Sequence, residues 1–293
     1  MHKSGFVNII GNPNVGKSTL MNALVGERLS IITSKAQTTR HRIMGIVSGE
    51  DFQIVYSDTP GILKPSYKLQ ESMMKFVTGA VTDADVILYV TDTVERSDRS
   101  AEIIERISRS GIPTIVVINK IDLSTPEALD ALVERWQTEI PGARIVPVSA
   151  KENFNVEGLF RTILELLPEG PAFYPKDTLT DKTLRFFASE IIREKILKFY
   201  DKEIPYCCEI EIESYKEEPA IDRIAATIYV ARDSQKGILI GHKGEKLKRV
   251  GQTAREDMEQ FLGKKVFLQL FVKVSDDWRN DERQLRRFGY EQE

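Results

Sequence analysis

Apolar runs and helix-like segments alternate along the chain from Gly5 to about Leu167. The apolar runs that read as strands cover residues 6–10, 52–56, 115–118 and 144–148. Strands that alternate with helices build parallel, doubly wound α/β sheets, which bind their ligands at the carboxyl edge of the strands. We therefore predict a doubly wound α/β domain over residues 1–170, with its active site on the loops that follow the strands.

The alternation stops at a stretch punctuated by prolines, Pro168–Pro171 and then Tyr174–Asp177, which suits neither a helix nor a central strand. We interpret residues 171–182 as an interdomain linker. Beyond it we expect a helix at about 183–200 and two strands at about 207–215 and 221–232. A helical region, a strand at about 266–274 and a final helix follow. This order predicts a second domain of the α+β class over residues 183–293.

A phosphate-binding loop stands between the first apolar run and the helix-like segment 19–25. It has the spacing G-x-x-x-x-G-K-S, in which backbone N–H groups surround the phosphates. Lys17 should contact the β and γ oxygens, and the Ser18 hydroxyl should bind magnesium. The nucleotide-binding residues predicted here are Gly11, Asn12, Pro13, Asn14, Val15, Gly16, Lys17, Ser18 and Thr19.

A second motif, Asn119-Lys120-Ile121-Asp122, follows the run 115–118 and distinguishes between bases. The Asp122 carboxylate can accept from both N1–H and N2–H₂ of guanine, and adenine has no such pair of donors. Asn119 and Lys120 should position and flank the base. A polar turn after the run 144–148 should complete the guanine pocket with a backbone N–H; it comprises Ser149, Ala150 and Lys151.

The run 52–56 leads into Asp58-Thr59-Pro60-Gly61. Asp58 can hold magnesium through water, and the Gly61 N–H can sense the γ-phosphate. Both neighbours, Thr59 and Pro60, are included in the predicted nucleotide site.

These four motifs in this order resemble the small GTPases of the translation-factor-related class and, more narrowly, the Era family. The stretch Lys35–Ile43 is similar to that family's first switch, and the resemblance implies that Thr39 binds magnesium when GTP is present. Without the resemblance, the same stretch is a polar, mobile loop between a helix and a strand. The expected metal ligands are therefore Ser18, Thr39 and, through water, Asp58.

The resemblance also bears on hydrolysis. It puts Ile62 where many signalling GTPases carry a glutamine that orients the attacking water, so slow intrinsic turnover is expected. In related GTPases an asparagine at the position of Asn14 helps to hold a potassium ion against the phosphates. The alternative is that Asn14 only shapes the loop. The expected catalytic residues are Lys17, Asn14 and Gly61.

In the second domain, an apolar helical turn and a glycine pair, Gly241 and Gly244, precede a basic helix. This arrangement resembles a KH domain of type II, whose loop grips the backbone of single-stranded RNA. The glycines let phosphates approach backbone N–H groups, and nearby lysines supply positive charge; the alternative is a solvated helix face after an ordinary turn. The predicted RNA-binding residues are Lys236, Ile240, Gly241, His242, Lys243, Gly244, Lys246, Lys248 and Arg249.

Composition restricts the picture further. The chain has 293 residues, 41% of them hydrophobic, and a formal net charge of −3, so an RNA site must be a local patch. It has neither a signal peptide nor an apolar segment of membrane-spanning length, which predicts a cytoplasmic protein. Its two cysteines, Cys207 and Cys208, are adjacent, which suits neither a disulfide framework nor C-x-x-C zinc ligands, and we predict that they are small strand residues.

The predicted fold is thus a doubly wound P-loop GTPase domain followed by an α+β KH domain. By resemblance, the chain is a GTP-hydrolysing switch with Mg²⁺, and with K⁺ as a further candidate, that binds the single-stranded 3′ end of small-subunit rRNA during assembly of the small ribosomal subunit. Peripheral contact with the inner face of the cell membrane is a family tendency for which the chain has no evident lipid motif. Two rivals are an RNA-binding scaffold with a non-hydrolysing nucleotide site and an ATP-dependent enzyme, which Asp122 disfavours.

Overall fold

The computed structural model describes residues 1–94 and 100–290, and the last three residues of the predicted second domain, 291–293, lie outside the described part. The chain divides into two compact units, one of residues 1–66 and 70–181 and one of residues 67–69 and 182–293. We describe each unit by itself. In the part of the chain that the structure describes, no helix is both long enough and apolar enough to cross a membrane.

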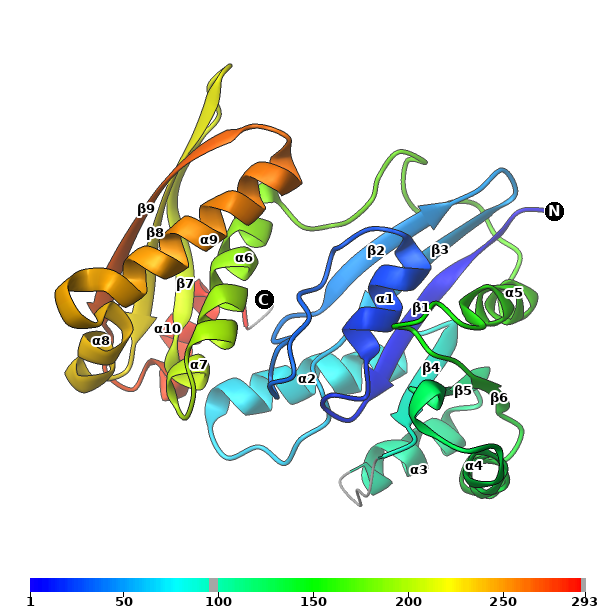
Figure 1. The fold of residues 1–293 in the computed structure, drawn as a ribbon. Helices are drawn as coiled ribbons and strands as arrows, with labels where there is room; N and C mark the ends of the chain where they lie inside the picture. The colour runs from blue at the N-terminus through cyan, green and yellow to red at the C-terminus, as the bar shows by residue number, and fades with distance from the viewer. Residues whose placement is uncertain (95–99, 291–293) are drawn as a thin grey trace. The chain divides into compact units, whose positions relative to one another are not determined.

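The first unit contains a six-stranded sheet with the strand order β2-β3-β1-β4-β5-β6 (Figure 1). Its strands are β1 (Lys3–Gly11), β2 (Ile43–Ser48), β3 (Phe52–Asp58), β4 (Val86–Asp92), β5 (Thr114–Asn119) and β6 (Arg144–Pro147). All neighbouring pairs are parallel except β2 and β3, which are antiparallel. The strand order reverses on either side of β1, so the fold is the predicted doubly wound α/β sheet.

Helices connect these strands and cover the sheet. They are α1 (Lys17–Val25), α2 (Lys68–Thr82), α3 (Ala101–Ser110), the 3₁₀-helix η1 (Ile121–Leu123), α4 (Pro126–Glu139) and α5 (Val156–Leu166). On one face, buried side chains of β1, β4 and β5 pack against α2, α3 and α4, with Val77, Ile107 and Trp136 among the helix residues. The predicted motifs therefore lie at the carboxyl ends of β1, β3 and β5.

Residues 168–181, which we call the edge strap, are bonded to the first unit. Ser4 N donates to Pro168 O over 3.1 Å, and Ile46 N, in β2, donates to Leu179 O over 2.8 Å. The fully buried Gln53 holds the middle of the strap: its amide donates to Tyr174 O over 2.8 Å and accepts from Phe173 N over 2.7 Å. Since β2 is an outer strand of the sheet, the strap covers backbone groups that would otherwise form an open edge. Most of the predicted linker therefore lies against the sheet of the first unit.

The second unit is an α+β unit, as predicted, with a three-stranded sheet in the order β7-β8-β9. Strands β7 and β8 are antiparallel, and β8 and β9 are parallel. Its elements are α6 (Leu184–Phe199), α7 (Ile204–Cys207), β7 (Glu209–Lys216), β8 (Ile221–Val230), α8 (Asp233–Ile240), η2 (His242–Gly244), α9 (Glu245–Leu262), β9 (Lys265–Val274), η3 (Trp278–Asn280) and α10 (Glu282–Arg287).

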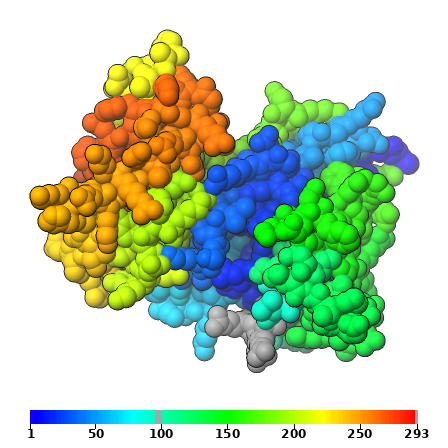
Figure 2. Space-filling view, in the orientation of Figure 1, coloured from blue at the N-terminus to red at the C-terminus, as the bar shows by residue number. Residues whose placement is uncertain are grey.

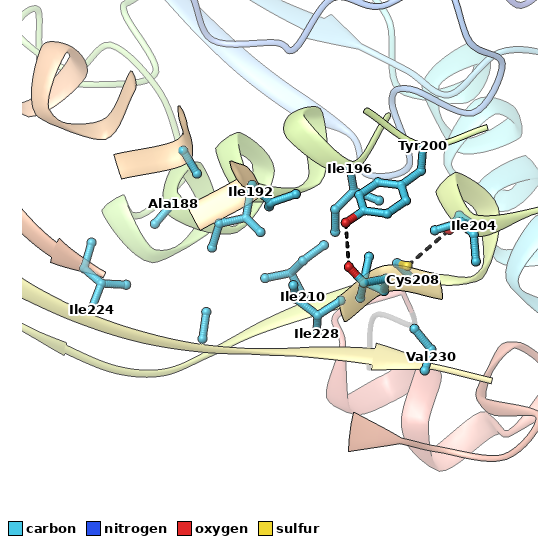
Figure 3. Packing of buried hydrophobic residues seen from close by; sticks show 14 of the residues in the cluster. Ala188, Ile192, Ile196, Tyr200, Ile204, Cys208, Ile210, Ile224, Ile228 and Val230 are labelled. Carbon is cyan, nitrogen blue, oxygen red and sulfur yellow. Dashed lines mark hydrogen bonds between the residues drawn. The ribbon is translucent and has the colours of Figure 1, made fainter. Parts of the chain in front are cut away.

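The core of this unit forms where α6 and α9 pack on the sheet, with Ile192, Ile196 and Ile228 fully buried (Figure 3). Tyr200 lies in this core and donates its hydroxyl to Leu239 O over 2.6 Å. Burial raises the pKa of Tyr200 to about 12, so its hydroxyl keeps the proton that this hydrogen bond requires.

The two cysteines correct one prediction. Cys207 ends α7 and Cys208 follows it, whereas β7 begins only at Glu209, so neither cysteine is a strand residue. Pro205 stands in the first turn of α7, where its fixed φ and missing N–H suit a helix start. Both thiols are buried and contact Ile204 O.

Candidate functional site

The phosphate loop occupies residues 11–16, between the end of β1 and the first turn of α1. Lys17 is almost fully buried, and its ammonium donates to Asn12 O over 2.8 Å, which holds it at the base of the loop. Gly16 has φ 96°, in the left-handed region, and a Cβ there would lie 2.2 Å from Asn119 Nδ2. Only glycine fits this position. The loop therefore delivers backbone N–H groups and the start of a helix to one point, as anion binding requires.

The three predicted metal ligands come together from three separate elements. Ser18 Oγ donates to Asp58 Oδ2 over 2.7 Å and lies 2.9 Å from Thr39 Oγ1, and Thr39 Oγ1 donates to the same carboxylate oxygen over 3.2 Å. The other oxygen, Asp58 Oδ1, is buried and has no hydrogen-bond partner among the described residues. This set contains only oxygen donors with one negative charge, which fits a hard cation such as Mg²⁺.

Burial raises the pKa of the Asp58 carboxyl above its usual range. The positive charge of Lys17 and hydrogen bonds from nearby hydroxyls, including that of Ser18, oppose this rise. A bound divalent cation would oppose it further, because positive charge favours the carboxylate form.

A cavity of about 260 Å³ lies next to these ligands. The phosphate loop and the start of α1 form one wall, residues between Ile31 and Thr39, which include part of the first switch, contribute much of another, and Gly61 and Lys120 complete the lining. In Figure 2 blue residues from the start of the chain lie beside green residues from the later part of this unit. Part of the first switch and the phosphate loop therefore line the same cavity.

Gly61 lies directly against the phosphate loop. A Cβ at this position would stand 2.8 Å from Pro13 Cα and 2.9 Å from Pro13 N, so a side chain would push the two loops apart. Ile62, the next residue, donates its N–H to Gly11 O over 3.1 Å, and its side chain is buried in the core. An apolar core side chain cannot orient water. Thr59 has a structural contact, since its hydroxyl donates to Ile9 O over 2.7 Å.

The residues predicted to recognise the base form a connected group. Asn119 donates to Val15 O over 2.9 Å and accepts from Ala150 N over 3.0 Å, so its side chain joins the phosphate loop to the turn after β6. Asp122 accepts the Ser149 hydroxyl on Oδ1 over 2.6 Å. Lys151, the next residue of the turn, is exposed, and its ammonium lies 3.1 Å from Glu152 Oε1.

Two residues that belong to none of the predicted motifs also contact this group. Asp92, at the end of β4, accepts from the Lys120 ammonium over 2.6 Å, and the Thr93 hydroxyl donates to Lys120 O over 3.2 Å. The available signal was weak: Asp92 follows an apolar run, as Asp58 does, and therefore stands at the same carboxyl edge of the sheet.

In the second unit, the glycine loop connects α8 to α9. Gly241 and Gly244 have φ 75° and 80°, and Lys243 between them also has a positive φ, of 48°. A Cβ on Gly241 would meet Lys246 Cγ at 2.7 Å, whereas a Cβ on Gly244 would meet nothing within 4 Å. Gly244 therefore combines a backbone conformation that favours glycine with open space in front of it.

The predicted RNA-binding cations divide into two groups around α9. Lys246 Nζ lies 5.9 Å from the ring centre of Tyr200, and Arg249 Cζ lies 4.2 Å from that of Phe199, so both face the end of α6. Lys248 lies on a different side of the helix, because it is two positions from Lys246 and one from Arg249. Lys243 and Lys248 are exposed. The remaining predicted residues surround the loop: Lys236 and Ile240 lie on α8, and His242 is exposed in η2.

A phosphate loop, an N-K-x-D motif at the end of β5 and a following glycine-loop domain define a P-loop GTPase joined to a KH domain. A family model described as 50S ribosome-binding GTPase matches residues 6–120, and one described as KH domain matches residues 203–279. The chain belongs to the Era family of GTPases: GTPase Era of Staphylococcus haemolyticus is 46% identical over 291 residues, which cover 99% of this chain and 97% of that protein. GTPase Era of Alkaliphilus metalliredigens is also 46% identical, over 99% of each chain.

Two solved structures are similar over the whole chain. One is a crystal structure of Era in complex with MgGDPNP and nucleotides 1506–1542 of 16S ribosomal RNA, with a TM-score of 0.96, 40% identity and full coverage of both chains. The other is an Aquifex aeolicus Era variant bound to GDP·AlF₄⁻, with a TM-score of 0.95 and 41% identity over 99% of this chain and all of that one. The predicted family, fold class and GTPase activity are thereby confirmed.

Proposed function

We propose that this GTPase couples its nucleotide state to binding of the single-stranded 3′ end of small-subunit rRNA during assembly of the small ribosomal subunit. The observation that carries the proposal is the glycine loop before α9, with its left-handed backbone and the open space at Gly244, on the same chain as a GTPase site. A relative of the same length and fold was crystallised with a magnesium-bound nucleotide and a 16S rRNA fragment, which supports both halves of the proposal.

In the nucleotide site, Lys17 and the N–H groups of the phosphate loop would bind the β- and γ-phosphates. The amide of Gly61, which lies against this loop, would contact the γ-phosphate. Ser18, Thr39 and Asp58 have the oxygen donors to hold Mg²⁺, which when bound neutralises charge that develops on the phosphates. Asp122 would accept from guanine, with Asn119 and Lys120 at the side of the base.

Potassium would enter this site through Asn14. Its side chain is exposed, lines the phosphate cavity and belongs to a residue with φ 66°, in the left-handed region. A cation there would stabilise the transition state in the absence of a water-orienting glutamine. Hydrolysis should therefore be faster in potassium than in sodium buffer at equal ionic strength, and Asn14→Ala should remove the difference. Equal rates in the two buffers for the unaltered protein would refute the potassium role.

On the RNA side, the amides around Gly241–Gly244 would bind backbone phosphates, and Ile240 would contact a base. Lys236, His242, Lys243 and Lys248 supply charge on or beside the loop. Lys246 and Arg249, which face α6, would extend the basic surface to that side. The proposed RNA contacts therefore use local charge on a protein whose net charge is slightly negative.

Phosphate release from GTP and ATP, measured with and without RNA that ends in a single-stranded pyrimidine-rich segment, tests the proposal. We expect the protein to hydrolyse GTP but not ATP, and we expect the rate of GTP hydrolysis to change when this RNA is added. An RNA whose 3′ end is base-paired is the matched control and should have little effect. GTP hydrolysis that responds to neither RNA would refute the coupling, and binding of RNA without any GTP hydrolysis would favour the scaffold.

We propose, on the same grounds, that the protein acts in the cytoplasm. Peripheral contact with the membrane is not needed for it and stays a prediction from the family resemblance.

A further inference from the structure

Lys120 adopts a backbone conformation that must be held in place. Its φ and ψ are 60° and 35°, in the left-handed region, which costs about 1–2 kcal/mol for a residue that has a Cβ. It immediately precedes η1, the short helix that carries Asp122. Any relaxation of Lys120 would therefore turn Asp122 away from the direction in which it meets a base.

The end of β4 supports Lys120 at two points. Asp92 Oδ2 accepts from the Lys120 ammonium over 2.6 Å, and the Thr93 hydroxyl donates to the Lys120 carbonyl over 3.2 Å. The carboxylate is itself fixed, because Asp92 Oδ1 accepts from Val94 N over 3.0 Å. Asp92 lies directly beside Asn119 in the β4–β5 pairing, and its side chain is only 7% exposed.

The Lys120 ammonium reaches further, to the phosphate loop. It donates to Asn14 O over 2.6 Å, and Asn14 has the same left-handed conformation, with φ 66°. One ammonium thus joins the carboxylate of Asp92 to the phosphate loop. A carboxylate and a carbonyl at this distance make strong, charge-assisted hydrogen bonds, so the ammonium has a fixed place between them.

Charge gives Asp92 a second effect. Lys17 and Lys120 both line the phosphate cavity. An ammonium without a carboxylate partner would be drawn towards bound phosphates, and Asp92 competes with them for Lys120. The carboxylate therefore keeps Lys120 at the base-recognition side of the cavity.

We propose that Asp92 is a positioning residue of the GTPase site. It acts through Lys120 and holds in place both the phosphate loop, at Asn14, and the base-recognition carboxylate of Asp122. This inference rests on the proposed guanine contact only where it concerns Asp122. Its link to the phosphate loop stands on the Asp92–Lys120–Asn14 contacts alone.

A double-mutant cycle on nucleotide affinity tests the link. In the full-length protein, Asp92→Ala should weaken binding of a fluorescent GDP analogue about tenfold or more, since a hydrogen bond between charged groups is lost. In the Lys120→Gln background the same substitution should change affinity less than about twofold, because the group through which Asp92 acts is gone. A tenfold loss in both backgrounds, or no loss in the first, would overturn the proposal.

Base selectivity gives the second readout. Inosine triphosphate lacks the guanine N2 amine, so the ratio of GTP to ITP affinity reports how well Asp122 is aimed. This ratio should fall in Asp92→Ala; an unchanged ratio would remove Asp122 from the proposal. If Asp122→Asn itself leaves GTP affinity unchanged, the guanine assignment fails, while the cycle between Asp92 and Lys120 still decides the link to the phosphate loop.

The matched control is Asp85→Ala. Asp85 precedes the same strand, and its carboxylate accepts from Phe6 N over 2.7 Å, far along the strand from the nucleotide loops. It should lower thermal stability without changing GDP affinity or the GTP-to-ITP ratio. If Asp92→Ala does not fold, Asp92→Asn takes its place: it keeps an acceptor but loses the charge, and it should weaken GDP binding by a smaller factor that also disappears in the Lys120→Gln background.

Discussion

At the scale of single residues, the surroundings of Asp122 suit the guanine contact that we propose for it. The Ser149 hydroxyl donates to Asp122 Oδ1, which helps to fix the plane of the group, and both carboxylate oxygens keep a lone pair with which to accept from a base. A polar group that is placed for one pattern of donors discriminates against ligands that lack them.

Asp122→Asn should therefore shift preference from GTP towards xanthosine triphosphate, because the new amide donates where the carboxylate accepted and xanthine carries a carbonyl in place of the guanine amine. Titration with a fluorescent analogue of each nucleotide measures the shift. Asp130→Asn, the same change on the exposed side of α4, is the control and should have no effect. Unaltered GTP affinity in Asp122→Asn would contradict the guanine assignment.

Neighbouring cations on α9 should behave differently from one another. Lys248→Ala should leave stability unchanged and reduce the slope of log affinity against log salt by about 0.7, as expected for one lost contact with a single-strand phosphate. Arg249→Ala should also destabilise the protein, by about 0.5–1 kcal/mol, because the guanidinium stacks on Phe199. RNA binding at several salt concentrations and thermal unfolding of both variants check this. Equal loss of stability in the two variants would contradict the division around the helix.

Motif spacing was sufficient to predict that Ser18, Thr39 and Asp58 come together, because short loops at the ends of parallel strands meet at one edge of the sheet. Asp92 was missed for a physical reason. Its partner Lys120 is 28 positions away, and only the pairing of β4 with β5 brings the two together. The orientation of Lys246 and Arg249 towards α6 likewise depends on tertiary packing, which a run of basic residues does not reveal.

At the scale of secondary-structure elements, the edge strap is the main difference from expectation. Its prolines correctly indicated a segment that is neither helix nor central strand. The sequence could not indicate where this segment lies, because its partner Gln53 is 120 residues away in the chain. The glutamine amide has one donor end and one acceptor end, and both contact backbone groups of the strap.

Gln53→Leu should release the strap. Leucine has a similar volume but leaves three backbone groups of Phe173 and Tyr174 without partners, at about 1–3 kcal/mol for each that stays buried. Hydrogen–deuterium exchange should accelerate in peptides that cover residues 171–181. Gln235→Leu, which removes a buried glutamine bonded to Ala231 N in the second unit, should leave that exchange unchanged. Unchanged protection of the strap in Gln53→Leu would show that Gln53 does not hold it.

At the scale of the whole molecule, two binding chemistries occupy separate compact units of one chain. The nucleotide site lies wholly in residues of the first unit, and the glycine loop lies in the second. A substitution in the glycine loop should therefore separate the two activities, which a single shared site would not allow.

The most direct test of this account is filter binding of single-stranded 3′-terminal small-subunit rRNA to Gly244→Asp, beside GTP turnover without RNA. The added carboxylate would stand where a phosphate should lie, so RNA affinity should fall at least about tenfold while turnover stays at the level of the unaltered protein. Gly263→Asp is the matched control: this glycine caps the other end of α9, also with a positive φ and open space, and its variant should bind RNA normally. Full RNA affinity of Gly244→Asp at physiological salt would contradict the central claim.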